Sequence, residues 1–459
     1  MQAVLLIDFG STYTKVTIVD LDKEEIVGTA RAGTTIETNI MDGMKAALKQ
    51  IPEPSGGWNF VRKLACSSAA GGLKMIASGL VKELTAEAAR RAALGAGARV
   101  LEVFSYELTK QDLDKIVNLK PDILLLAGGT DGGNKEVILK NAEMLSTLPI
   151  GLPIVFAGNK TAAGQAADSL KKRHNPVVIA DNVMPELGVL SVESARLAIR
   201  EVFLSHIIHA KGLDKAEEFL ERILMPTPSA VLSAAELLAK GHGSEPGMGE
   251  LMIVDVGGAT TDVHSIAKGD PSKPGVMLKG LPEPFAKRTV EGDLGMRYSS
   301  EALVETAGKR LVDYLGWDND QINCQLNLCK EDPWRTPQTP EEEKFDLAMG
   351  RMAVSVAVER HAGTMEVVYT PFGASYIQNG KDLTPLPVVI GTGGVLLYQR
   401  NPQEILQGAV FNSQEPTILK PQEPGFYLDK EYILAAMGLL REVAPQATLR
   451  MMKKYIVKL

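Results

Sequence analysis

The chain has 459 residues, of which 45% are hydrophobic and 23% charged, a composition typical of a folded protein of two or three domains and not of a disordered chain. Its net charge is −7, without a dense run of lysine or arginine, which argues against a nonspecific nucleic-acid-binding surface. No uncharged apolar stretch is long enough to span a bilayer, and the N-terminal MQAVLLIDFG lacks the basic region of a signal peptide. Three cysteines in so long a chain favour reduced thiols, so we expect a cytoplasmic protein.

The first half of the chain predicts a β-hairpin followed by an α/β region. Strands are expected at 4–7 and 15–20, joined by a glycine-bearing turn. The Ala-, Leu- and Arg-rich stretch 73–98 favours a helix, and Thr85–Ala88 within it resembles a helix N-terminus. From residue 122 onward, short apolar strands alternate with helical segments, a pattern that indicates a parallel α/β sheet.

Two further helical regions are expected at about 191–224 and 229–240, and the Gly- and Pro-rich stretch 241–249 is a candidate linker. Directly after it, LMIVDVGGATTDVHSI predicts a second hairpin of the same design as the first. Both have an aspartate, a glycine two residues later, a turn and a β-branched strand. Two copies so far apart in the chain indicate a duplicated fold and not a solenoid.

The last third contains a polar, proline-bearing stretch at 318–343, which we expect to be a loop. It is followed by the apolar strand and glycine-rich turn VVIGTGG at 388–394, and by a helix near 430–441.

The first hairpin has the residues of an anion-binding turn. Gly10 allows close backbone approach, so that consecutive N–H groups can point at an anion, and Ser11 and Thr12 add hydroxyl donors. Asp8 ends an apolar strand and can hold Mg²⁺ through water. Lys15 suits a phosphate contact and a solvent-facing position equally well.

The second hairpin repeats this set with Asp255, Gly257, Gly258, Thr260 and Thr261. Two such hairpins facing each other across a cleft would hold a polyphosphate and its metal. An aspartate in a turn can also merely cap its own backbone, but two copies with matching neighbours favour the ligand-binding interpretation. Glycines in the third motif would let backbone pack against a purine or ribose. These residues are Gly391, Thr392, Gly393 and Gly394.

With these motifs in this order, the sequence resembles the superfamily of actin, heat-shock chaperone ATPases and sugar kinases. LLIDFGSTYTKVTIVD resembles its first phosphate motif, LMIVDVGGATTDVHSI its second and VVIGTGGVLLY its adenosine motif. PTPSAVLSAAELLAKG and YILAAMGLL resemble its connecting helices. EGDLG resembles a helix start beside the nucleotide, which adds Glu291 and Gly292 to the candidate cofactor-binding residues.

The resemblance implies an α/β protein with a duplicated actin-like ATPase (ribonuclease H-like) fold, in which two lobes enclose a nucleotide cleft. Residues 1–240 would form the first lobe, with an α/β insertion near 100–190. Residues 241–428 would form the second lobe, and 429–459 a C-terminal helix that packs back on the first. ATP and Mg²⁺ would be the cofactors, with Asp8 and Asp255 as the catalytic and metal-binding residues.

Within this superfamily the chain resembles the MutL/GlmL proteins associated with adenosylcobalamin-dependent glutamate mutase, which are unrelated to the DNA-repair protein of similar name. The closer resemblance rests on CSSAAGGLKMIASGLVKELTAEAARRAALGAGA, LLLAGGTDGGN and GNKTAAG. It implies a slowly hydrolysing, ATP-dependent chaperone that reactivates a cobalamin-dependent mutase, either glutamate mutase or a related amino mutase. The alternatives are a small-molecule kinase of the same fold and a nucleotide-binding scaffold without catalysis.

Two features depart from a simple reading of these motifs. The chaperone members carry an acid just before the proline of the first connecting helix, whereas this chain has Thr227. Slow hydrolysis would follow, unless Asp8, Asp255 or a residue such as Glu236 activates the water. The glycines at 128–133 suit either an anion-binding turn or a strand-to-helix crossover, and we favour the crossover.

Overall fold

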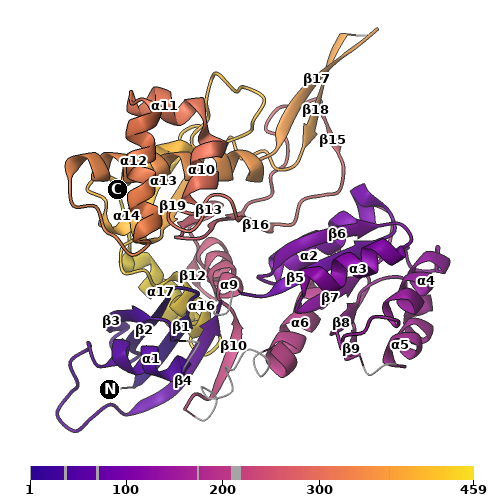
Figure 1. Ribbon diagram of the computed structural model, residues 1–459, viewed down its shortest axis with the longest axis horizontal. Coiled ribbons are helices and arrows are strands. Elements are labelled where there is room, and N and C mark those ends of the chain that lie inside the picture. The colour runs from indigo at the N-terminus through magenta and orange to yellow at the C-terminus, as the bar shows by residue number, and fades with distance from the viewer. Residues whose placement is uncertain (1, 36–38, 69–71, 173–174, 208–218, 372) are drawn as a thin grey trace. The chain divides into compact units, whose positions relative to one another are not determined.

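The computed structural model describes residues 2–35, 39–68, 72–172, 175–207, 219–371 and 373–459 (Figure 1). The chain divides into two compact units. The first comprises Met1–Ala234, Gly280–Pro282 and Ala435–Thr448, and the second Ala235–Lys279, Glu283–Leu434 and Leu449–Leu459. Three of the boundaries fall inside helices, namely α9 (Thr227–Lys240), α16 (Leu434–Leu440) and α17 (Pro445–Tyr455).

The first unit is built on a five-stranded sheet of order β10-β4-β1-β2-β3. The strands β1, β2 and β3 form an antiparallel meander, and β4 and β10 lie parallel to β1. Every residue of β1 is buried, as expected for a central strand. The bounds are β1 (Ala3–Phe9), β2 (Tyr13–Asp20), β3 (Glu25–Gly33), β4 (Phe60–Ser67) and β10 (Arg222–Pro226), with α1 (Ile40–Leu48) packed on β2 and β3.

The second unit repeats this topology in a sheet of order β16-β14-β13-β19-β20-β21. Here β13, β14 and β16 form the antiparallel meander, and β19 and β20 are the parallel strands. The bounds are β13 (Leu251–Val256), β14 (Thr261–Ile266), β16 (Ala286–Glu291), β19 (Val388–Thr392), β20 (Gly425–Asp429) and the added strand β21 (Ile456–Lys458). The same order and directions in both sheets confirm the predicted duplicated ribonuclease H-like fold.

The helices of the second unit and a small second sheet surround this core. The 22-residue α13 packs on β13, β14 and β16. The α-helices between β16 and β20 are α10 (Ser300–Ala307), α11 (Lys309–Leu315), α12 (Asn319–Glu331), α13 (Pro340–His361), α14 (Gly394–Tyr398) and α15 (Pro402–Leu406). The small sheet contains β15 (Val276–Lys279), β17 (Thr364–Thr370) and β18 (Gly373–Asn379).

An inserted α/β region in the first unit contains a second five-stranded sheet, of order β6-β5-β7-β8-β9, with every pairing parallel. This confirms the predicted parallel sheet. Its strands are β5 (Lys74–Gly79), β6 (Arg99–Ser105), β7 (Ile123–Leu126), β8 (Ile154–Phe156) and β9 (Val177–Ile179). One face is covered by α2 (Glu87–Gly95) and α6 (Glu193–Val202), and the other by α3 (Lys110–Leu119), α4 (Glu136–Leu145) and α5 (Ala163–Lys171).

Three sequence-based expectations were wrong in whole or in part. In the stretch 73–98 the helix α2 begins at Glu87, close to the expected start at Thr85–Ala88, but Lys74–Gly79 is a central strand of the inserted sheet, because tertiary burial overrides helix propensity. The expected loop 318–343 contains the helix α12. The N-terminus of this helix is closed by a capping box, in which Asp318 and Gln321 each bind the other's backbone N–H. The helical prediction for 191–224 holds for α6 and a short continuation to Ile207, but its end is strand β10, and residues 208–218 lie outside the described residues.

The C-terminal elements are α16 (Leu434–Leu440), which confirms the predicted helix, followed by α17 and β21. In the first unit α16 crosses α9 closely, since a Cβ on Gly438 would lie 1.9 Å from the carbonyl oxygen of Ala230. The predicted linker forms a tight hairpin of β11 (Gly241–His242) and β12 (Glu245–Pro246). Within the described part of the chain, no helix is long and apolar enough to cross a membrane.

Candidate functional site

The first predicted phosphate motif forms the turn between β1 and β2. The N–H of Gly10 donates to the carbonyl oxygen of Tyr13 over 3.0 Å, and a Cβ on Gly10 would lie 2.5 Å from that oxygen. The turn itself therefore requires glycine at position 10. Because its N–H is engaged, an anion at this turn would be bound by Ser11 and Thr12, which are exposed and half-buried respectively.

Asp8 is held by three side chains of the first unit. Across the β1–β2 ladder it faces Lys15, whose Nζ lies 3.2 Å from Oδ2. The Thr227 hydroxyl donates to Oδ1 over 2.6 Å, and the Cys66 thiol, opposite Asp8 on β4, lies 3.6 Å from the same atom. The carboxylate is only 4% exposed. It is therefore fixed in place and already paired with one positive charge.

Thr227 and Cys66 have roles that the sequence motifs do not reveal. Thr227 takes the position where the resemblance places an acid, and it donates a hydrogen bond to Asp8. Burial, together with the charge of Asp8, raises the pKa of the Cys66 thiol well above its usual value. Cys66 is therefore an uncharged thiol beside Asp8.

The second predicted phosphate motif forms the turn between β13 and β14 and repeats the first in its backbone. The N–H of Gly257 donates to the carbonyl oxygen of Thr260 over 2.9 Å, and a Cβ on Gly257 would lie 2.9 Å from that oxygen. At Gly258, by contrast, a Cβ would meet no atom of the described residues closer than 3.9 Å. Gly258 is thus not required by packing within the turn, since a Cβ there would make only ordinary contacts with Arg297 and Tyr298.

The segment after β16 wraps around this second turn. The N–H groups of Arg297 and Tyr298 donate to the carbonyl oxygen of Gly258 over 2.8 and 2.9 Å. The Thr261 hydroxyl donates to the carbonyl oxygen of Leu294 over 2.6 Å. The stretch that contains the predicted residues Glu291 and Gly292 is therefore fixed against the turn, with Glu291 directly opposite Thr261 in the β14–β16 ladder.

Arg360, on α13, organises the acidic start of this segment. Its guanidinium lies 2.8 Å from a Glu291 oxygen and 2.8 and 2.9 Å from the two Asp293 oxygens. Burial raises the pKa of Glu291, whereas the hydrogen bond from Arg360 lowers the pKa of Asp293. Arg360 was not identified from the sequence, because α13 lies far from this segment along the chain.

The third motif follows β19, which pairs with β13 and places Thr392 opposite Asp255. Gly393 has φ +108°, and a Cβ there would lie 2.3 Å from the carbonyl oxygen of Val256, so packing requires this glycine. At Gly394 a Cβ would have no described atom within 4 Å. Packing also requires Gly391, where a Cβ would come within 2.9 Å of two leucine side chains.

The two hairpins differ in charge. The place of Lys15, opposite Asp8, is taken in the second hairpin by Asp262, opposite Asp255. Asp262 is paired with Arg288, whose Nε and Nη2 lie 2.8 and 2.6 Å from Oδ1. The Arg288 side chain is 3% exposed. Equivalent turns therefore present different electrostatic surroundings.

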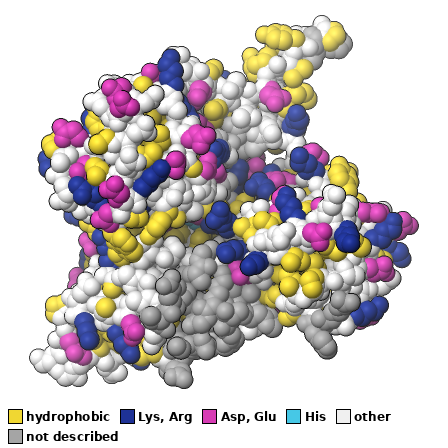
Figure 2. Space-filling view, viewed as in Figure 1, with side chains coloured by type: hydrophobic (Ala, Val, Ile, Leu, Met, Phe, Trp, Pro, Cys, Tyr) yellow, Lys and Arg dark blue, Asp and Glu magenta, His cyan; other side chains and the backbone are white. Residues whose placement is uncertain are grey.

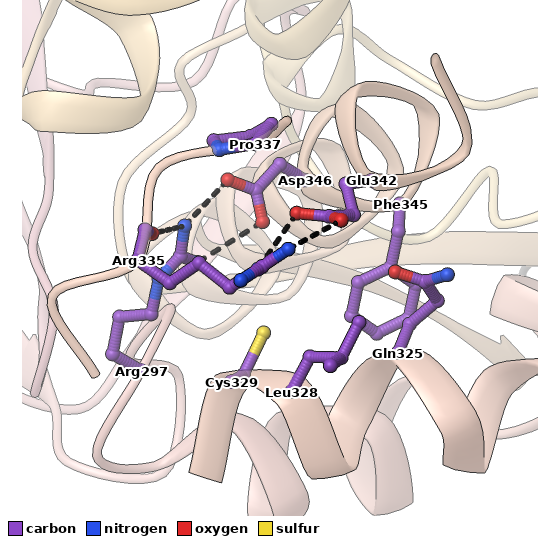
Figure 3. Close-up of a pocket in the computed structure, with 9 residues that line it drawn as sticks. All are labelled: Arg297, Gln325, Leu328, Cys329, Arg335, Pro337, Glu342, Phe345 and Asp346. Atoms are coloured by element: carbon purple, nitrogen blue, oxygen red, sulfur yellow. Dashed lines mark hydrogen bonds and ion pairs between the residues drawn. The ribbon is translucent and has the colours of Figure 1, made fainter. Parts of the chain in front are cut away.

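A pocket lies beside the second hairpin (Figure 3). Arg297, whose backbone contacts Gly258, extends its side chain into the pocket wall and pairs with Asp346 at 3.0 and 2.5 Å. Arg335 pairs similarly with Glu342, with two contacts of 2.9 Å. Because both arginines are paired with carboxylates, the pocket does not offer a free cation to an anionic ligand.

The glycine-rich loop 128–133 connects β7 to α4, which confirms the predicted strand-to-helix crossover. The buried Asn159 side chain accepts from the N–H of Gly132 and donates to the carbonyl oxygens of Gly133 and Asn134. A second buried amide, Asn182, donates to the carbonyl oxygen of Gly129. The loop is thus held by side chains of its own unit.

The structure brings the candidate residues into two groups, one in each unit. Within the described residues, no group of three or more His, Cys, Asp or Glu side chains could hold a metal ion. The first group contains Asp8, Gly10, Ser11, Thr12 and Lys15. The second contains Asp255, Gly257, Gly258, Thr260, Thr261, Glu291, Gly292, Gly391, Thr392, Gly393 and Gly394.

Two sheets of one topology, each with a glycine turn after its first strand, define a duplicated actin-like α/β protein. The family described as MutL protein matches residues 4–456. Protein MutL of Clostridium tetanomorphum is 55% identical over 461 residues, which cover 100% of both chains. The chain therefore belongs to the MutL family.

The solved structures that match this chain include a xylulose kinase and a glycerol kinase. Ligand-bound xylulose kinase from Lactobacillus acidophilus matches with 12% identity and a TM-score of 0.35, covering 100% of this chain and 93% of that one. Glycerol kinase of Plasmodium falciparum, solved with ADP, matches with 11% identity and a TM-score of 0.37, covering 99% and 92%. Component A of (R)-2-hydroxyglutaryl-CoA dehydratase from Acidaminococcus fermentans matches with 10% identity and a TM-score of 0.26, covering 99% of both chains.

Proposed function

We propose that the chain binds ATP with Mg²⁺ and uses the nucleotide to drive the reactivation of an adenosylcobalamin-dependent mutase. The observation that carries the nucleotide proposal is the repeated turn. The N–H of Gly10 and that of Gly257 make the same hydrogen bond, over 3.0 and 2.9 Å, after equivalent strands of two equivalent sheets. Two turns conserved so closely within one chain support a shared ligand with several phosphates.

Asp8 and Asp255 would hold the metal. Mg²⁺ is commonly bound through one or two carboxylates and the substrate phosphates, and it keeps several of its waters. A site with few protein ligands is consistent with this mode of binding. Asp8 fits it because its carboxylate is fixed by Thr227 and Lys15. The metal would neutralise charge on the phosphates.

The adenosine would lie against the third motif, where Gly394 leaves space and Thr392 stands opposite Asp255. Hydrolysis would be slow, because Thr227 has no carboxylate to orient the attacking water. A slow ATPase suits a protein whose role depends on nucleotide-dependent states more than on turnover. The mutase partner is proposed from membership of the MutL family, and glutamate mutase or a related amino mutase is the candidate.

Calorimetric titration with ATP and Mg²⁺ tests the nucleotide site. Asp8→Asn and Asp255→Asn should each weaken binding about tenfold or more, because a hydrogen bond or ion contact to a charged group contributes ~1.5–3 kcal/mol. Asp42→Asn and Asp320→Asn, exposed acids of the two units, are matched controls and should bind ATP normally. Wild-type affinity in both site variants, with unchanged melting temperatures, would show that the site is elsewhere.

The partner is tested separately, by affinity purification of the tagged chain with ATP or with ADP. The expected result is recovery of a mutase subunit in amounts that depend on the nucleotide, with a cobalamin absorption spectrum in the eluate. Rapid ATP consumption that requires one sugar, polyol or short acid would instead identify a kinase. Nucleotide binding without hydrolysis or a partner would favour a scaffold.

A further inference from the structure

The three-stranded sheet β15-β18-β17 projects from the second unit and exposes apolar side chains (Figures 1 and 2). The cross-strand partners Val367 and Tyr376 are 48% and 45% exposed, and Tyr369 is 85% exposed. On the opposite face Val368 and Met277 are 39% and 54% exposed. Single exposed apolar residues are ordinary, but neighbouring ones such as Val367, Tyr369 and Tyr376 on one face mark an interaction surface.

The outer edge of β17 is partly occupied by the chain itself. Among the described residues β17 is the last strand of its sheet. The N–H of Met365 points outward and donates to the carbonyl oxygen of Thr417 over 2.7 Å. Since backbone groups alternate along a strand, the N–H and C=O groups of Val367 and Tyr369 face the same outer side. The outer backbone groups of Val367 and Tyr369 can therefore pair with another strand.

We propose that β17 pairs edge to edge with β17 of a second copy of this chain, in an antiparallel arrangement centred on Val368. This register places Val367 of each copy opposite Tyr369 of the other as hydrogen-bonded pairs. The two Val368 residues face each other as the non-hydrogen-bonded pair on the two-fold axis. The apolar face of each sheet then continues into the other.

A second copy fits this edge because the edge is complementary to itself. In the proposed register Glu366 stands opposite residue 370 of the other copy, so the two carboxylates do not meet. The segment from Glu366 to Tyr369 has no proline and no lysine, the residues that commonly prevent edge pairing. Thr417, which already pairs with Met365, lies beyond the residues that would pair.

Disulfide trapping tests the register directly. In a non-hydrogen-bonded antiparallel pair the Cα atoms lie ~4.5 Å apart, within the range that a disulfide spans. Val368→Cys should therefore form an intermolecular disulfide under mild oxidation. Glu366→Cys, on the same face of the same strand, is the matched control, since its two copies would be separated by about four residues, or ~14 Å. Both variants are made with Cys324→Ser, because Cys324 is exposed.

The expected result is cross-linking of Val368→Cys at least ten times faster than of Glu366→Cys. Sedimentation of the wild-type chain should show a concentration-dependent dimer. Val368→Lys should weaken the dimer by placing like charges face to face, whereas Met277→Lys, on the far edge of the sheet, should not. Equal cross-linking of the two cysteine variants, or a wild-type chain that stays monomeric at high concentration, would overturn the proposal.

Discussion

The buried pair of Arg297 and Asp346 offers a direct test of how the second hairpin is supported. The two side chains are 15% and 9% exposed and make two contacts, of 3.0 and 2.5 Å. Replacing Asp346 with alanine leaves a buried guanidinium without its carboxylate, which costs about 3–5 kcal/mol. We therefore expect Asp346→Ala to lower the free energy of unfolding of the second unit by about this amount.

A double-mutant cycle separates the pair from its surroundings. Arg297→Ala removes the other charge, and the double variant removes both. The double variant should therefore lose less free energy of unfolding than the sum of the two single losses, by about 2 kcal/mol or more. The exposed pair of Lys330 and Glu301, with side chains 42% and 71% exposed, is the control. Glu301→Ala should cost less than ~1 kcal/mol.

The assay is urea unfolding followed by tryptophan fluorescence in a Trp58→Phe background, which removes the tryptophan of the first unit. Trp317 stacks on Phe345, next to Asp346, with ring centroids 6.3 Å apart, and so reports on the affected region. ATP affinity is a second readout, because the backbone N–H of Arg297 donates to Gly258. If Asp346→Ala cost no more than Glu301→Ala, or if the single costs simply added, the pair would not support the hairpin as argued.

Three further predictions concern pH, glycine and Thr227. Burial lowers the pKa of His264 to about 3 and that of His361 well below its usual value. At low pH the unfolded chain therefore binds protons that the folded chain does not, so the free energy of unfolding is full above pH ~6.5 and falls as the pH decreases, by about 2 kcal/mol at pH 5 for His264 alone. In urea unfolding at pH 7 and pH 5, His264→Leu should reduce this difference in stability. Gly393→Ala should impair folding and ATP binding because its Cβ would overlap backbone, whereas Gly394→Ala should leave the melting temperature unchanged and weaken only ATP binding. Thr227→Val should weaken Mg²⁺-dependent ATP binding in calorimetry, because it removes the hydrogen bond to Asp8. Unchanged binding would show that this hydrogen bond does not contribute to ATP binding.

The hairpins were predictable because their signal is local. A strand, an aspartate, a glycine two residues later and a second strand lie within one short stretch, and the second copy repeats them in order. The turn geometry of Gly10 and Gly257 follows from this stretch alone, since donor and acceptor are three residues apart. The duplicated fold then follows from finding the same local pattern twice.

The contacts that fix the site were not predictable, because they join distant parts of the chain. Asp8 meets Cys66 only because β1 and β4 are parallel neighbours, and it meets Thr227 from the helix that follows β10. Local composition also misled at two elements. The apolar strand β5 directly precedes an alanine-rich helix, so the composition of the whole stretch predicts a helix. The sequence of α12 is polar and therefore resembles a loop, although the helix begins at a capping aspartate.

The duplication preserved the backbone of the two hairpins more faithfully than their charge. Asp8 faces a cation, Lys15, at 3.2 Å, whereas Asp255 faces a second carboxylate, Asp262, whose charge is balanced by Arg288. Removing Arg288 would leave the Asp262 carboxylate without its paired cation, and breaking a buried ion pair in this way is strongly destabilising. A divalent cation at the second hairpin would be attracted by two carboxylates, whereas at the first it would compete with Lys15 for Asp8. The symmetry of the fold therefore does not extend to the charge of the two hairpins, and we expect Asp8 and Asp255 to contribute unequally to metal binding.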